Sequence, residues 1–121
     1  MHTVSELKSF RNAADKAGMT EDDIADLVDF LASNPTAGDE MKGTGGCRKV
    51  RVAGRGKGKS GGYRTITFFT GDTMPVFLIT VFSKGERANL SQKEREKLRQ
   101  LTKLIVSEYQ ERVTQISTLG A

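Results

Sequence analysis

The 121-residue sequence contains one cysteine, Cys47, one histidine, His2, and no tryptophan. A lone cysteine excludes a disulfide within the chain, and with only one histidine it cannot complete a zinc site of four nitrogen and sulfur ligands. The longest apolar run, residues 75–82, is far shorter than the roughly 20 residues that a membrane-spanning helix needs. We therefore expect no disulfide, no metal site and no membrane span, and we take the cytoplasm as the expected location.

Hydrophobic residues make up 36% of the sequence and charged residues 28%, a balance typical of a globular protein with a modest core. A chain of 121 residues is about the size of one ordinary domain. We therefore expect residues 1–121 to form a single domain, with residues 112–121 as a tail that is free to fray.

The formal net charge of +4 hides a strong asymmetry along the chain. Residues 1–40 carry three basic and nine acidic side chains, whereas residues 41–71 carry eight basic side chains and no acidic one. The basic segment favours a polyanion as its partner. The acidic segment is either a docking surface, for a partner or for the chain itself, or simply a solvated face.

Two amphipathic helices are predicted near the N-terminus. In residues 5–17 apolar side chains share one face, and Gly18 provides a C-terminal stop. The second helix has Thr20 as its N-cap, three acidic residues in its first turn and an apolar repeat of three or four positions. It is expected to end near Asn34, because Pro35 disfavours helical geometry in the residue before it.

Strands are predicted in the middle of the chain. From Cys47 to Val52 apolar and basic residues alternate, as in a half-buried strand. Residues 63–69 and 75–82 are rich in β-branched and aromatic residues and flank a turn-forming segment, which predicts an antiparallel pair. The second of these is apolar on both faces, so we expect it to be central. Residues 2–4 are a candidate for a further short strand.

A C-terminal helix is predicted to follow the strands. Ser91 as N-cap and Glu94 three residues later form a capping box, and an apolar stripe continues to about Glu111. The predicted order is therefore two helices, a strand, a loop, two strands and a helix, which is an α+β arrangement.

The loop between the first two of these strands alternates glycine with Arg55, Lys57 and Lys59 and is too flexible to pack. Residues 53–60 also match a permissive phosphate-binding-loop pattern. Such a loop must lead into a helix whose N-terminus receives the phosphate, whereas this one leads into a predicted strand. We therefore expect neither a bound nucleotide nor any other cofactor.

Two interpretations of this loop remain, a clamp for the phosphates of a nucleic acid and a solvated connection. The clamp is favoured because the flanking strands are basic as well, and each neutralised phosphate releases counterions. The basic residues on these strands are Arg48, Lys49, Arg51 and Arg64.

Cleavage of an RNA strand requires a base for the 2′-hydroxyl, stabilisation of charge on the phosphate and stabilisation of the departing 5′-oxygen. The only histidine, His2, is expected at a peripheral position, so a pair of imidazoles is absent. Crowded lysines with a lowered pKa can transfer protons, and arginine can stabilise the transition state. Such a site is a weak catalyst unless another molecule orients the RNA.

Three blocks of the sequence resemble the HigB-type branch of RelE toxins. They are GTGGCRKVRVA at residues 43–53, GKGKSGGYR at residues 56–64 and PVFLITVFSKGERANLS at residues 75–91. The last block is similar to the family's final strand, its corner and the start of its C-terminal helix. The resemblance, from about residue 34 to about residue 105, implies a RelE/ParE-like α+β fold with two N-terminal helices, a small twisted antiparallel sheet and a C-terminal helix.

The resemblance also implies a toxin that enters the ribosomal A site and cleaves mRNA, which inhibits translation. It implies neutralisation by a cognate antitoxin, commonly a helix-turn-helix DNA-binding protein, so that the toxin meets DNA only through that partner. Carried over by position, it assigns phosphate stabilisation to Arg64 and proton transfer or charge stabilisation to Lys59 and Lys84. The expected RNA-binding residues are Arg48, Lys49, Arg51, Arg55, Lys57 and Tyr63.

One position departs from the family's pattern, because Phe82 stands in the corner where relatives frequently have tyrosine. A phenylalanine there packs in the core and transfers no proton. Either Tyr63 or Lys84 then acts as the base, or the protein is a slow or inactive nuclease.

Two other functions remain compatible with this fold. A ParE-like toxin shares the fold but acts on DNA gyrase, and a noncatalytic module binds nucleic acid without cutting it. The contiguous basic loop and strand favour RNA cleavage, because a gyrase inhibitor has no evident need for a phosphate clamp.

Overall fold

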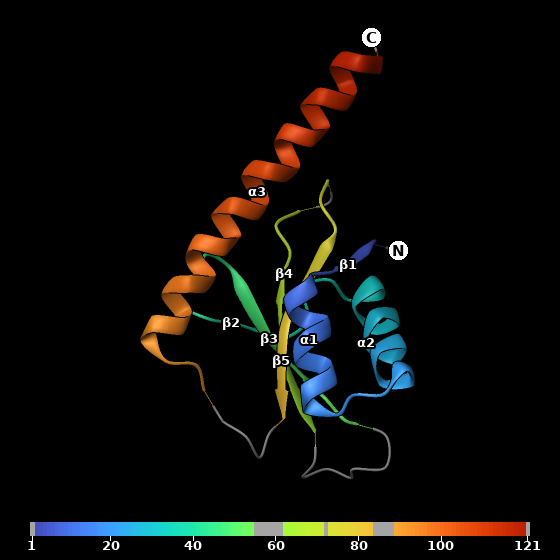
Figure 1. The fold of residues 1–121 in the computed structure, drawn as a ribbon, viewed down its shortest axis with the longest axis vertical. Helices are drawn as coiled ribbons and strands as arrows, with labels where there is room; N and C mark the ends of the chain where they lie inside the picture. Colours follow the sequence, from blue (N-terminus) through green and yellow to red (C-terminus); the bar gives the residue numbers. More distant parts are fainter. Residues whose placement is uncertain (1, 55–61, 72, 84–88, 121) are drawn as a thin grey trace.

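The computed structural model describes residues 2–54, 62–71, 73–83 and 89–120, with side chains as far as residue 109. Its architecture is mixed α+β, with two helices near the N-terminus and one at the C-terminus, as the sequence predicted (Figure 1). The elements in chain order are β1 (Val4–Glu6), α1 (Lys8–Ala17), α2 (Glu21–Ser33), β2 (Asp39–Glu40), β3 (Cys47–Val52), β4 (Tyr63–Phe68), β5 (Val76–Ser83) and α3 (Gln92–Gly120).

The five strands form one sheet in the order β1-β5-β4-β3-β2. Strands β2 to β5 pair in antiparallel fashion, as expected, but β1 pairs in parallel with β5. The sheet is therefore mixed, because the long stretch of chain between β1 and β5 supplies the crossover that a parallel pair requires. β5 is an interior strand between β1 and β4, although β4 holds the central place.

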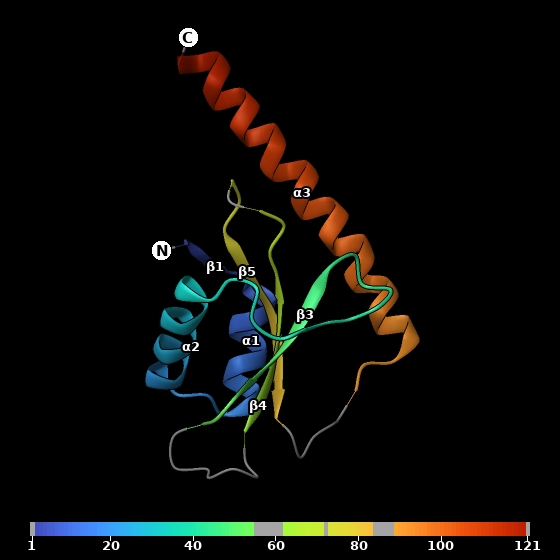
Figure 2. The same ribbon diagram turned by 180° about the vertical axis from the view of Figure 1, so that it is seen from behind.

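The helices cover the two faces of the sheet. On one face, Phe10 of α1 and Leu31 of α2 pack in a core with Val50 of β3. On the other, Ile105 of α3 packs in a second core with Cys47 of β3. Figures 1 and 2 show this arrangement from opposite sides. We refer to these surfaces as the α1/α2 face and the α3 face.

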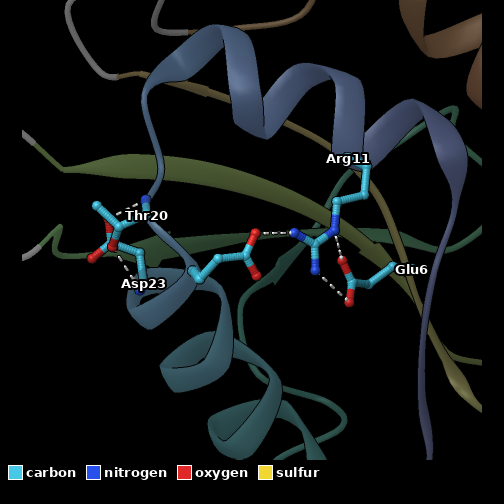
Figure 3. Close-up of polar contacts among 5 residues, drawn as sticks. Glu6, Arg11, Thr20 and Asp23 are labelled. Atoms are coloured by element: carbon cyan, nitrogen blue, oxygen red, sulfur yellow. Dashed lines mark hydrogen bonds and ion pairs between the residues drawn. The ribbon is translucent and has the colours of Figure 1, made fainter.

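The predicted signals at the N-terminal helices are confirmed, with one exception. At the start of α2, the Asp23 N–H donates to Thr20 Oγ1 and the Thr20 N–H donates to Asp23 Oδ2, both at 3.1 Å (Figure 3). Gly18 ends α1 with a left-handed φ of 83°, which glycine adopts without strain. The exception is the beginning of the first helix, because residues 4–6 pair with β5 as a strand instead.

Arg11 ties the N-terminal elements together (Figure 3). Its Nε lies 2.7 Å from Glu6 Oε1 on β1, and its Nη1 lies 2.6 Å from Glu21 Oε1 on α2. Hydrogen bonds to Glu6 and then to Glu21 raise the pKa of Arg11 above its usual value. This basic side chain is therefore fully engaged by carboxylates of the chain itself.

The α3 helix begins at the predicted capping box, where the Ser91 N–H donates to Glu94 Oε1 at 2.9 Å and the Glu94 N–H donates to Ser91 Oγ at 3.2 Å. It continues to Gly120, so the expected end near Glu111 is wrong. Extending an established helix costs far less than nucleating one. The C-terminal part of α3 projects beyond the sheet (Figures 1 and 2). In the part of the chain that the structure describes, no helix is both long enough and apolar enough to cross a membrane.

Candidate nucleic-acid interface

The candidate interface lies at the end of the sheet where β3 and β5 finish and β4 begins. The strand register places Val52, Tyr63 and Ser83 in one row across β3, β4 and β5. The segments that lead away from Val52, into Tyr63 and away from Ser83 therefore all start from the same edge. These are the loop between β3 and β4 and the connection from β5 to α3.

One row further in, Arg51 of β3 lies directly opposite Arg64 of β4. Arg51 is exposed and Arg64 is half-buried. Like charges placed opposite each other on neighbouring strands repel and destabilise a sheet. Among the described residues, neither guanidinium has an ion pair or a side-chain hydrogen bond, in contrast to Arg11. Within the described part of the chain the pair therefore has no counter-charge, which suits it to an anion that contacts both groups.

Lys49 extends this pair along the same face. Residues 47, 49 and 51 alternate with Val50, which packs on the α1/α2 face, so Lys49 and Arg51 lie on the α3 face with Cys47. Lys49 Nζ is 3.5 Å from Asn89 Oδ1, in the residues before α3. Its opposite residue on β2 is Asp39, so this cation has an acidic neighbour that Arg51 lacks.

Arg48 is separated from the other basic residues of β3. The alternation of the strand places it on the α1/α2 face. Its Nη1 donates to the carbonyl oxygen of Gly38 at 3.2 Å, and Glu40 lies opposite it on β2. The structure therefore brings together Lys49, Arg51 and Arg64 but not Arg48.

Tyr63, at the start of β4, is a buried residue. Its side chain is fully buried in the core of the α1/α2 face, and its hydroxyl donates to the carbonyl oxygen of Gly18 at 3.2 Å. A β-carbon at Gly54 would lie only 2.5 Å from its ring. The burial of Tyr63 and its contact with Gly18 indicate a structural role at the base of the loop, and its predicted role in RNA binding stays a prediction.

Phe82 lies directly opposite Arg64 on β5 and is 5% exposed. It packs in the core of the α3 face. Its buried ring is thus the apolar neighbour of Arg64 on β5. The resemblance predicted this position as the corner after the final strand, where relatives frequently have tyrosine.

Four of the predicted site residues, Arg55, Lys57, Lys59 and Lys84, lie outside the described residues. Lys84 directly follows Ser83, which pairs with Tyr63, and the loop residues follow Gly54. The direct opposition of Arg51 and Arg64 was missed by the sequence reasoning, since it depends on strand register. Among the described residues, no three histidine, cysteine, aspartate or glutamate side chains gather as they would around a metal ion.

The sequence matches the family model described as "RelE toxin of RelE / RelB toxin-antitoxin system" over residues 3–121. The chain belongs to the RelE toxin family. The match runs from β1 to the end of α3, so it includes the basic edge and the projecting part of the helix. This RelE-family protein is thus the toxin of a toxin-antitoxin system, with an antitoxin as its partner.

Proposed function

We propose that this toxin is an endoribonuclease that cuts mRNA on the ribosome and thereby inhibits translation. The observation that carries the proposal is the opposed pair of Arg51 and Arg64 at an edge from which the most basic loop of the chain departs. A phosphate between two guanidinium groups relieves their repulsion and accepts hydrogen bonds from both. A single-stranded RNA backbone supplies a series of such phosphates.

The roles follow from the chemistry of strand cleavage by the 2′-hydroxyl. Arg64 stabilises the charge that develops on the phosphate. Lys59 and Lys84 accept the proton of the 2′-hydroxyl and protonate the departing 5′-oxygen, while Arg48, Lys49, Arg51, Arg55 and Lys57 hold the RNA or the ribosome. The three roles are met by basic side chains, so the proposal assigns no step to a metal ion.

Dependence on the ribosome is supported by the residues that could act as a base, because among the described residues no histidine or exposed tyrosine lies beside the arginine pair. His2 contacts Phe69 in an edge-to-face arrangement, with ring centroids 5.2 Å apart, and Phe69 follows the end of β4 remote from Arg64. Tyr63 is buried and Phe82 carries no titratable group. With proton transfer left to lysines, the ribosome contributes by holding the 2′-hydroxyl in line with its phosphate, since orientation alone can lower a barrier by several kcal/mol.

The test uses purified toxin, translating ribosomes and a defined mRNA, with product ends mapped by primer extension. We expect cleavage by the unaltered toxin and a loss of about a hundredfold or more when Arg64→Ala and Lys84→Ala are combined. A matched variant with Lys8→Ala and Lys103→Ala, two exposed cations elsewhere, should retain cleavage. Undiminished cleavage by the Arg64/Lys84 variant, or inhibition of gyrase in place of cleavage, would contradict the proposal.

A further inference from the structure

A second surface feature lies at the opposite end of the molecule, where α3 passes the outer strand β1. A cavity of about 230 Å³ opens between them. Most of the described side chains around it are apolar, and among them Glu108 is the one charged group. The lining residues are Ser5, Leu7, Phe77, Ile105, Glu108 and Tyr109. We call this feature the β1–α3 groove.

An exposed leucine, Leu104, directly precedes the groove residue Ile105 on α3. It is 55% exposed, and it and Phe30 of α2 are the large apolar side chains that stand exposed among the described residues. Leu104 precedes Glu108 by four residues, so both lie on the same side of α3, one turn apart. A scattered surface leucine is ordinary, but a leucine beside an apolar groove enlarges a contiguous patch of the kind that binds proteins.

The strand wall of the groove presents backbone groups that have no partner among the described residues. β1 is the outermost strand of the described sheet. The Val76 N–H donates to the carbonyl oxygen of Thr3 at 2.8 Å, and the Leu7 N–H donates to that of Leu78 at 3.0 Å. In the alternation of a parallel pair, the backbone groups of Val4 and Glu6 therefore point away from β5. A segment of another protein can bond to this edge while its side chains enter the groove.

The position of the groove indicates its occupant. The groove lies beside the start of β5, whereas Arg64 lies opposite Phe82 near its end. A protein bound here therefore does not need to displace RNA. The partner common to the family is the antitoxin.

We propose that the β1–α3 groove and Leu104 form a docking site for the antitoxin, which inserts apolar side chains into the groove and pairs a basic residue with Glu108. The proposal rests on membership of the toxin family and not on RNA cleavage. The antitoxin is thereby held on the toxin by a surface separate from the basic edge.

The test compares Leu104→Glu with Phe30→Glu, which places the same charge on the other exposed large apolar residue. Affinity for the cognate antitoxin, purified from the co-expressed pair, is measured by titration calorimetry. Loss of an interface anchor commonly costs tenfold or more in affinity, so we expect Leu104→Glu to weaken binding at least about tenfold. Phe30→Glu should bind like the unaltered toxin, and Glu108→Lys should weaken binding as well.

Both glutamate variants should keep the native circular dichroism spectrum and the native growth arrest, because neither position belongs to the basic edge. An unchanged antitoxin affinity for Leu104→Glu overturns the proposal, and so does an effect confined to self-association of the toxin. A toxin that binds its antitoxin through Leu104 yet cuts no RNA refutes the proposed nuclease and leaves the docking site standing.

Discussion

The repulsion between Arg51 and Arg64 is expected to lower the free energy of unfolding of the toxin. Replacing Arg51 with glutamine removes one of two like charges that face each other across β3 and β4, while most of the side-chain stem is retained. We expect the Arg51→Gln variant to be more stable than the unaltered toxin and, at the same time, to bind RNA less tightly.

The size of the effect follows from the geometry of a cross-strand pair. Two unit charges about 7 Å apart repel by about 0.6 kcal/mol in water, and roughly 0.1 M salt halves this value. The partial burial of Arg64 lowers the local dielectric constant and increases the repulsion, and directly opposed pairs contribute up to about 1 kcal/mol. We therefore expect a gain of about 0.3–1 kcal/mol, which raises the Tm by about 1–4 °C.

The assay is urea unfolding at low salt and again at about 0.5 M NaCl, where screening should remove most of the gain. Arg11→Gln is the matched control, because Arg11 contacts Glu6 and Glu21 and its replacement should not stabilise the protein. A loss of stability in Arg51→Gln, or a gain that is independent of salt, would refute the idea that Arg51 and Arg64 repel each other.

Three further predictions concern buried groups in and beside the sheet. Tyr63→Phe removes the hydrogen bond to Gly18 and should lower the free energy of unfolding by about 1 kcal/mol, with RNA cleavage unchanged; a large loss of cleavage at full stability would show a catalytic role. Gly54→Ala places a β-carbon against the Tyr63 ring and should destabilise by about 1–3 kcal/mol, measured by urea unfolding; an unchanged midpoint would contradict the close approach. Burial raises the pKa of Cys47 to about 11, so the folded state holds this proton more tightly than the unfolded state, and stability should fall as pH rises from about 9 to about 11. Cys47→Ala should flatten that fall in a pH series of unfolding curves, and an equal slope in both proteins would show that the thiol is not its source.

Local signals predicted most of the secondary structure. The caps at Thr20 and Ser91 act on backbone groups within three residues, so the starts of α2 and α3 could be predicted from short stretches of sequence. The parallel position of β1 and the two-residue strand β2 could not, because each depends on a partner strand elsewhere in the sheet. The full length of α3 was missed because helix propagation is governed by the preceding turns more than by the residues at the end.

The sequence predicted which basic residues belong to the candidate site, but not how they are arranged on the sheet. The run of basic residues indicated which segment meets a polyanion, whereas the opposition of Arg51 and Arg64 required the register of β3 and β4. The different placements of Tyr63 and Arg64 could have been predicted, since consecutive residues of a strand point to opposite faces. The separation of Arg48 from Arg51 follows from the same alternation.

The most direct test of the central claim is a map of mRNA 5′ ends across the transcriptome of cells in which the toxin is induced. The account predicts new ends inside translated codons soon after induction, and no such ends with the variant that combines Arg64→Ala and Lys84→Ala. Growth arrest with intact messages and blocked DNA supercoiling would contradict it, as would ends that fall equally in untranslated regions.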